Sequence, residues 1–203
     1  MTIEEQILNV SAKLFIDFGV KSVSIDDICA RLHISKKTFY VYFKQKEDLL
    51  SAILREERTR REKKLAAIEA DSKQNVINAM IADTRFFVGH KVERHMCFFY
   101  DLKKYYPNVF FEHKKEMAKV KKDRTERFLH KGIDEGLFRN DLNISTMALF
   151  LNMLSESFFE DFQKERKAPI GEIVNFLIDT LMRSIVSTEG LKYYEEMKKE
   201  IEI

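Results

Sequence analysis

Apolar residues recur at steps of three and four through most of this chain, which is the spacing of amphipathic helices. A first helix is predicted over residues 4–18, and Gly19 supplies its stop. Ser24 and Ser35 each stand before a short apolar stripe, so each is expected to cap a short helix. Only two residues separate the first stripe from Ser35, so the two short helices must cross steeply. They should close a small core against the first helix, formed by Leu32, Ile34, Phe39 and Phe43.

Helical stripes continue after this N-terminal part. A fourth helix starts near Leu49 and passes through a charged run to about Ala70 without proline or glycine, so it would connect two domains rigidly. Pro107 and Gly136 are the predicted stops of two later helices. Helices are therefore expected over residues 76–88, 98–105 and 109–135.

Two helices near the end of the chain carry apolar residues over most of their circumference. The first is predicted over residues 144–162 and the second over residues 170–187. A helix that is apolar almost all round has to be covered on two sides, so this pair predicts a subunit interface. The last stripe, over residues 191–201, could dock onto the fold or fray.

The composition favours an all-α fold. The chain has 203 residues, of which 45% are apolar and 33% charged, with only two prolines and six glycines. We expect a three-helix N-terminal domain over residues 1–48 and a helical C-terminal domain over residues 49–203, with about nine helices in all. Cys29 and Cys97 lie among apolar neighbours and are expected to be buried free thiols. No signal peptide or membrane-spanning run stands out, so the expected location is cytoplasmic.

The net charge of +2 hides a local excess of positive charge. Between Arg31 and Lys46 the chain has five lysines or arginines, and no acid occurs there until Glu47 follows. Because the second short helix lies in this segment, the pattern is that of a basic helix-turn-helix. Such a unit places a short helix in the major groove of DNA, while cations and hydroxyls hold the phosphates. The sequence therefore predicts a double-stranded DNA operator as a partner.

The outward side of the second short helix is set by exclusion, because its two phenylalanines are expected to point inward. Lysine can donate to guanine O6 and N7, so exposed lysines there are candidates for reading bases. The candidates for contacts with base edges are Ser35, Lys36, Lys37 and Tyr40. The candidates for phosphate contacts, which set register rather than sequence preference, are Thr38, Tyr42 and Lys46. Ser24, at the start of the first short helix, completes the predicted DNA-binding set.

Several motifs occur in a fixed order over about residues 5–55. They are Gly19, the capped start at Ser24, the stretch Ser35-Lys36-Lys37-Thr38-Phe39-Tyr40-Val41-Tyr42-Phe43, and the helix start Lys46-Glu47-Asp48-Leu49. This order resembles the N-terminal DNA-binding domain of the TetR family of transcriptional regulators. A second, weaker resemblance occurs in a later turn, Gly136-Leu137-Phe138-Arg139-Asn140-Asp141-Leu142. This turn is similar to the one before that family's last two helices.

The sequence departs from the family pattern at two positions. His33 stands where the family usually has glycine in the turn. Histidine tolerates a left-handed backbone, so the turn is expected to survive. Lys37 stands where a small residue is common, so the base preference of relatives does not carry over to this chain.

The resemblance implies a one-component regulator that binds a palindromic operator as a homodimer, joined through its last two long helices. It also implies a small apolar or amphipathic ligand in the C-terminal domain, whose binding releases the DNA, and a repressor is the favoured form. Aromatic residues concentrate after residue 85, and each could fill the core instead of lining a pocket. The candidate ligand-binding residues are Phe87, His95, Phe99, Tyr100, Phe128 and Asn152.

Catalytic and metal-binding patterns are weak in this sequence. His90 and His95 are five residues apart and do not share a helix face, and the cysteines lack the spacing of a metal site. No nucleophile triad or phosphate-binding glycine motif stands out. We therefore expect no enzyme activity, no metal and no cofactor apart from the small-molecule effector. The other class that fits is an all-α ligand-binding or scaffold protein without sequence-specific DNA binding.

Overall fold

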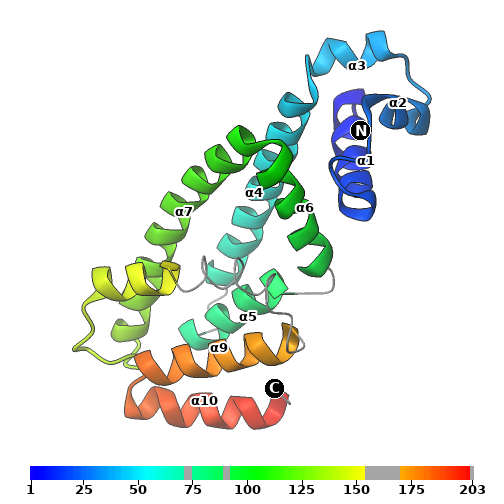
Figure 1. Ribbon diagram of the computed structural model, residues 1–203. Helices are drawn as coiled ribbons and strands as arrows, with labels where there is room; N and C mark the ends of the chain where they lie inside the picture. Colours follow the sequence, from blue (N-terminus) through cyan, green and yellow to red (C-terminus); the bar gives the residue numbers. More distant parts are fainter. Residues whose placement is uncertain (71–74, 89–91, 154–169, 202–203) are drawn as a thin grey trace. The chain divides into compact units, whose positions relative to one another are not determined.

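The computed structural model describes residues 1–70, 75–88, 92–153 and 170–201, and these are almost entirely helical (Figure 1). The helices are α1 (Ile3–Phe18), α2 (Ile25–Leu32), α3 (Lys36–Tyr42), α4 (Lys46–Ala70), α5 (Val76–Val88), α6 (Val92–Tyr105), α7 (Pro107–Asp134), α9 (Ile170–Ile185) and α10 (Thr188–Ile201). A further helical stretch covers residues 144–153. Within the described ranges no strand forms, and the one β-type pairing is a bridge between Phe138 and Val186. The predicted all-α fold is confirmed.

The chain divides into two compact units, which we call unit 1 and unit 2. They are Met1–Lys63 with Lys91–Met117, and Lys64–His90 with Ala118–Ile203. Helices α4 and α7 therefore each contribute residues to both units. The predicted domains over residues 1–48 and 49–203 divide the chain by function, and that division stays a prediction.

Unit 1 is built on one apolar core shared by α1 to α4, α6 and the start of α7. Phe39 of α3 and Leu102 of α6 are completely shielded from solvent. Phe43 is buried, and Leu32 and Ile34 are partly buried against the same core. The small core predicted for the N-terminal helices is therefore confirmed. It also extends to α6, which is more than fifty residues away in the sequence.

The helices end close to the predicted stops. α1 ends at Gly19, whose φ of 86° is open to glycine without strain. α4 begins at Lys46, before the predicted start, so that Glu47 and Asp48 fall in its first turn, where carboxylates are favourable. α7 begins at Pro107 itself, because a proline is tolerated at the first helical position, where the N–H would lack a helical partner.

Unit 2 has a second apolar core between α5, the C-terminal part of α7, residues 144–153, α9 and α10. Ile77 of α5, Leu129 of α7 and Ile185 of α9 are completely shielded from solvent. The helix predicted over residues 144–162 is described as far as residue 153, and its remaining residues lie outside the described part of the chain.

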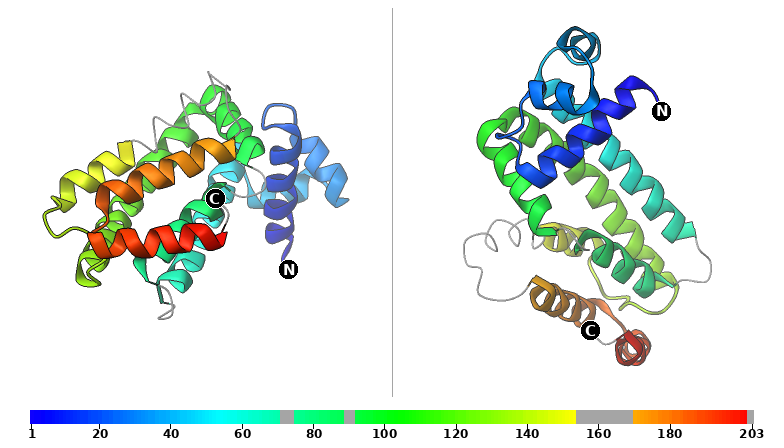
Figure 2. Two further views of the ribbon diagram at one scale, coloured as in Figure 1. Left: turned by 90° about the horizontal axis from the view of Figure 1, so that it is seen from below. Right: turned by 90° about the vertical axis from the view of Figure 1, so that its right-hand side faces the viewer.

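Helices α9 and α10 lie side by side and run antiparallel (Figure 2). α9 ends two residues before its predicted end, where Val186 forms its bridge with Phe138. Tyr194 of α10 is completely buried, and Leu191 and Met197 are partly buried on the same core. Of the two alternatives left open for the last stripe, the structure shows docking.

The turn at Gly136 holds the junction between α9 and α10. Gly136 has a φ of 71°, which favours glycine. Arg139 N donates to Ile185 O (2.9 Å), and Ser187 N donates to Leu137 O (2.9 Å). This turn is the later segment whose sequence resembles the TetR family. Its backbone hydrogen bonds require a compact loop, and Gly136 allows the chain to form one.

Both cysteines are free thiols, but their exposure differs. Cys29 is buried as predicted, whereas Cys97 is exposed, so that prediction was wrong for Cys97. The reason is its place on α6: Phe98 and Leu102 face the core, and Cys97 lies beside that stripe rather than on it. Among the helices that the structure describes, none is long and apolar enough to cross a membrane.

Candidate nucleic-acid interface

Two serines start the helices of the turn motif. Ser24 Oγ accepts a hydrogen bond from Asp27 N (3.2 Å) and donates to Asp27 Oδ2 (2.6 Å) at the start of α2. Ser35 Oγ accepts from Thr38 N (3.0 Å) and lies 2.8 Å from Thr38 Oγ1 at the start of α3. Both predicted caps are confirmed. They satisfy backbone N–H groups that have no partner inside a helix, and so fix where α2 and α3 begin.

His33 makes the turn between α2 and α3. Its φ of 54° and ψ of 38° are left-handed, and no other non-glycine residue of the described ranges has a positive φ. This reversal lets Ile34 N donate to Cys29 O (3.1 Å), which closes the end of α2. The turn therefore forms with histidine in place of the family's usual glycine, as predicted.

Helix α3 presents its polar residues outward. Phe39 is fully shielded and Phe43 is buried, as predicted. Of the predicted phosphate contacts, Tyr42 is exposed and Thr38 is half-buried. The predicted base contacts are all exposed: Ser35, Lys36, Lys37 and Tyr40. Exposure makes these contacts possible, and the contacts themselves stay predictions.

The two lysines at the start of α3 have different surroundings. Lys36 Nζ lies 2.7 Å from Asp26 Oδ1 of α2, and this hydrogen-bonded pair raises the pKa of Lys36. Both side chains of the pair are about three-fifths exposed, so water competes for it and the pair can open. Lys37 is exposed and forms no ion pair with the residues that the structure describes. Lys37 is therefore the cation of α3 that is directly available to DNA.

Lys46, predicted to contact phosphate, turns its ammonium group toward the protein. Lys46 Nζ donates to the carbonyl oxygens of Val20 and Val23, each at 2.5 Å. It also lies 5.2 Å from the ring centroid of Phe15 and 5.6 Å from that of Tyr106. Burial lowers the pKa of Lys46, although nearby acids oppose this. These contacts indicate that Lys46 holds the loop between α1 and α2 onto α4, and a phosphate contact by Lys46 stays a prediction.

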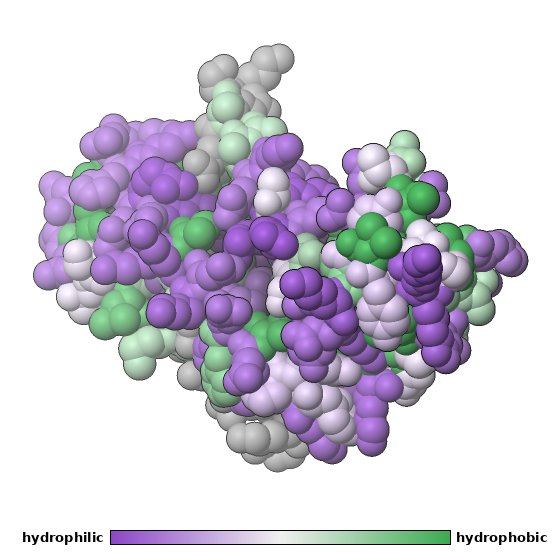
Figure 3. Space-filling model, turned by 90° about the horizontal axis from the view of Figure 1, so that it is seen from above, coloured by the Kyte–Doolittle hydropathy of each residue, from purple (hydrophilic) through white to green (hydrophobic). Residues whose placement is uncertain are grey.

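Val41 is an outward residue of α3 that the charge pattern did not indicate. Its side chain is 74% exposed. The signal that could have revealed it is its position two residues after the buried Phe39, because that spacing points to the opposite side of a helix. Figure 3 shows the face on which α3 lies, where hydrophilic residues predominate and apolar ones form small groups.

The predicted ligand-binding residues are distributed over both units. Phe99 and Tyr100 lie on α6 in unit 1, and Tyr100 is exposed. Phe128 is buried in the core of unit 2, the unit that also contains Asn152. A pocket formed by this set stays a prediction. The side chains of two members lie outside the described residues, those of Phe87 and His95.

An aromatic pair in unit 1 joins α6 to α7. Phe99 stacks on His113, with 5.7 Å between the ring centroids. Burial lowers the pKa of His113 and the neighbouring Arg58 lowers it further, so the imidazole is neutral at neutral pH. His113 Nδ1 is buried and has no hydrogen-bond partner among the described residues. A buried polar atom of this kind usually has a partner, which a ligand could supply.

Unit 2 exposes large apolar side chains on the helices predicted to form the subunit interface. Leu149, Phe150 and Met153 are 58%, 49% and 60% exposed on the stretch at 144–153. Phe176 of α9 is 69% exposed. Large apolar side chains gathered on two helices are typical of a surface that another protein covers. The identity of the covering partner stays a prediction.

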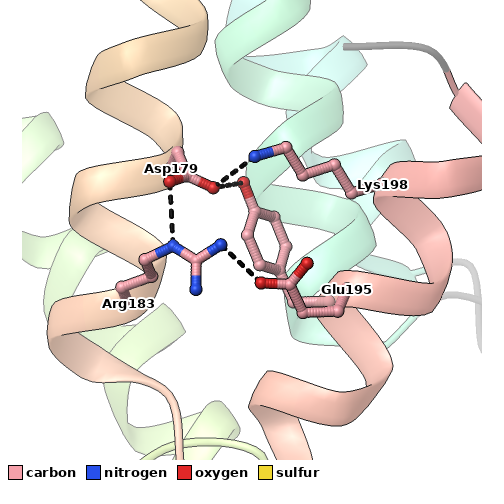
Figure 4. A network of polar contacts seen from close by, with 5 residues as sticks. Asp179, Arg183, Glu195 and Lys198 are labelled. Atoms are coloured by element: carbon pink, nitrogen blue, oxygen red, sulfur yellow. Dashed lines mark hydrogen bonds and ion pairs between the residues drawn. The ribbon is translucent and has the colours of Figure 1, made fainter.

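A polar network fixes α10 to α9 (Figure 4). Asp179 Oδ2 accepts from Arg183 Nε (2.8 Å), and Arg183 also pairs with Glu195 of α10. Asp179 Oδ1 accepts from Lys198 Nζ (2.7 Å) and from Tyr194 OH (3.2 Å). The hydrogen bond from Arg183 is the largest cause that lowers the pKa of Asp179 to about 2. The carboxylate is therefore ionised at neutral pH and holds α10 beside α9.

Comparison with known families tests the assignment of the N-terminal helices. Residues 7–53 match the bacterial regulatory proteins of the tetR family. The N-terminal helices of this chain are therefore similar to those of tetR-family regulatory proteins. The matched residues contain α2, the turn at His33, α3 and the start of α4, which are the elements of the candidate interface. This supports a DNA-binding regulator.

Solved structures share the fold of this chain over most of its length. A protein of Saccharomonospora viridis solved in complex with choline has a TM-score of 0.76 at 17% identity, covering 91% of this chain and 97% of its own. Escherichia coli NemR in its reduced form has a TM-score of 0.72 at 15% identity, with the same coverage of 91% and 97%. A TetR-family regulator from Agrobacterium tumefaciens has a TM-score of 0.71 at 17% identity, again covering 91% and 97%. At these identities the likeness shows the fold alone, and no curated protein matches the sequence.

Proposed function

We propose that the regulator is a repressor that binds a palindromic operator as a homodimer and leaves it when a small apolar or amphipathic ligand binds. The observation that carries the proposal is the geometry of α2 and α3: two capped helices joined by the left-handed His33, with Lys37 unpaired among the described residues on the outer side. A short exposed helix with a cation and hydroxyls suits the major groove. This function needs neither a catalytic residue nor a cofactor, and it would place the protein in the cytoplasm with its DNA.

The homodimer is supported by the exposed apolar residues of unit 2. Phe176 and Met153 lie on the two helices that the sequence assigned to the interface. A two-fold dimer presents two copies of α3, and such pairs read inverted repeats whose half-sites are about 34 Å apart, or a multiple of this distance. A palindromic operator is therefore the partner that fits a dimer of this chain.

Release by a ligand is supported by two observations. The structural relative from Saccharomonospora viridis was solved with choline, so a protein of this fold does bind a small molecule. In this chain, His113 stacks on Phe99, and its buried Nδ1 has no hydrogen-bond partner among the described residues. A ligand that favours the conformer unable to bind DNA by about 3 kcal/mol would lower operator affinity roughly a hundredfold.

The proposal is tested by selecting bound fragments from random and genomic duplexes with the full-length protein. We expect an inverted repeat to be enriched, and we expect its genomic position to indicate candidate ligands for release. Recovered duplexes without a common sequence would favour the alternative, an all-α ligand-binding or scaffold protein. An enriched site that is a single half-site, without symmetry, would contradict the homodimer but not DNA binding.

A further inference from the structure

Helix α3 turns one side directly away from the core of unit 1. Phe39 is completely buried, and Lys37 and Val41 lie two residues before and after it. At about 100° per residue, both lie roughly 160° around the helix from Phe39. Val41 is 74% exposed, against 48% for Tyr40 and 39% for Tyr42. Lys37 and Val41 therefore form the outermost ridge of α3, one helical turn apart.

At this exposed position, Val41 contributes little to the stability of the protein. A β-branched residue lowers helix propensity, and an exposed valine buries little apolar area. Its side chain has no donor or acceptor, so it can neither bind a phosphate nor read the hydrogen-bonding pattern of a base. The apolar group that a base edge offers in the major groove is the C5-methyl group of thymine.

We infer that Val41 reads the C5-methyl group of a thymine in each half-site of the operator. The inference rests on the proposed DNA-binding function. One turn of α3 advances about 5.4 Å, and successive base pairs are about 3.4 Å apart, so the two ridge residues meet bases one or two pairs apart. Because Lys37 can donate to guanine O6 and N7, the half-site should contain a guanine and a thymine at that separation.

Deoxyuridine differs from thymidine only by this methyl group, so it provides the test. In a duplex that the full-length protein has selected, each thymine is replaced by uracil in turn and the dissociation constant is measured. Wild-type protein should lose about fourfold in affinity at one position of a half-site, the value of one buried methyl group. Val41→Ala should bind the thymine duplex more weakly and should show no further loss with uracil at that position.

The matched control is Phe18→Ala. Phe18 is 66% exposed at the end of α1, so this variant removes another exposed apolar side chain from unit 1 without touching α3. Phe18→Ala should lose as much affinity as the wild type when uracil replaces that thymine. The thermal unfolding of Val41→Ala should match that of the wild type, because an exposed side chain contributes little to the core.

Two results would overturn the inference while the proposed function stands. One is an unchanged affinity of the wild type for every uracil duplex. The other is a uracil effect that persists in Val41→Ala, since another residue would then read the methyl group. A wild-type protein that selects no duplex at all would overturn the proposed function, and the inference with it.

Discussion

His33 holds a backbone conformation (φ 54°) that costs an ordinary L-residue about 1–2 kcal/mol. His33→Gly removes this strain but increases the freedom of the unfolded chain, so we expect a net rise of about 0.5 kcal/mol in the free energy of unfolding. His33→Val should lower it by about 1 kcal/mol or more, because β-branched residues resist positive φ. Thermal unfolding of both variants measures this. A glycine variant that is less stable than the wild type would show that the imidazole contributes contacts that outweigh the strain.

Lys46 differs from the other lysines of the basic segment because its ammonium group serves the fold. In Lys46→Met, the carbonyl oxygens of Val20 and Val23 lose this donor, so the free energy of unfolding should fall by about 2 kcal/mol. Affinity for operator and random duplexes should fall together, since the loop before α2 is no longer fixed. Lys44→Met, at an exposed lysine, is the matched control and should keep its stability. If Lys46→Met unfolds like the wild type but binds DNA more weakly, Lys46 acts as a phosphate contact.

The contrast between Lys36, Lys37 and Lys46 shows what a sequence can predict about single residues. Helical periodicity fixes which side of a helix faces the core, so the burial of Phe39 and the exposure of Lys37 were predictable. The partner of a long side chain depends on how helices cross. Asp26 beside Lys36 and the loop carbonyls around Lys46 therefore became visible only in the structure.

At the scale of elements, the docking of α10 depends on the network around Asp179. The folded pKa of this carboxyl, about 2, lies below its usual 3.8, so the folded state binds a proton less readily than the unfolded state. The network's contribution to stability is therefore complete above about pH 4 and is lost as the pH falls toward 2. With its partly exposed side chains, the network is worth on the order of 1 kcal/mol.

Asp179→Asn should lose this contribution at neutral pH and flatten the acid part of the unfolding profile. The measurement is urea unfolding at a series of pH values between 2 and 7 for both proteins. Arg139 and Asp141 form another ion pair in unit 2, with more exposed side chains. Asp141→Asn therefore serves as the control, and we expect a smaller change in the free energy of unfolding. Parallel profiles for Asp179→Asn and the wild type would show that the carboxylate does not contribute in this pH range.

The sequence predicted most helices because their stops are local. Gly19, Pro107 and Gly136 act through their own backbone geometry, and the serine caps act within three residues. The docking of α10 was left open because a short apolar stripe looks alike whether it packs or frays. Its outcome depends on Tyr194 reaching Asp179 of α9, which is a tertiary contact. The packing of α6 into the core of unit 1 is likewise a tertiary contact, so it could not be predicted from local sequence.

At the scale of the whole molecule, the proposed homodimer can be tested with a single substitution. Phe176→Glu places a charge on an exposed apolar residue of α9, and a buried unpaired charge would prevent two copies from closing over it. We expect the variant to be a monomer by analytical ultracentrifugation, with much weaker operator binding. Phe111→Glu changes another exposed phenylalanine, on α7, and should remain a dimer. Dimeric Phe176→Glu would place the interface elsewhere.

The central claim is that this protein acts by holding DNA through the helices at its N-terminal end. The most direct test is the salt dependence of binding to the selected duplex, measured by fluorescence anisotropy. A dimer that makes about 6–10 phosphate contacts should lose about 10³-fold or more in affinity between 50 and 200 mM salt, and should prefer this duplex to random DNA throughout. Affinity that changes little with salt, or that is equal for selected and random duplexes, would contradict the account.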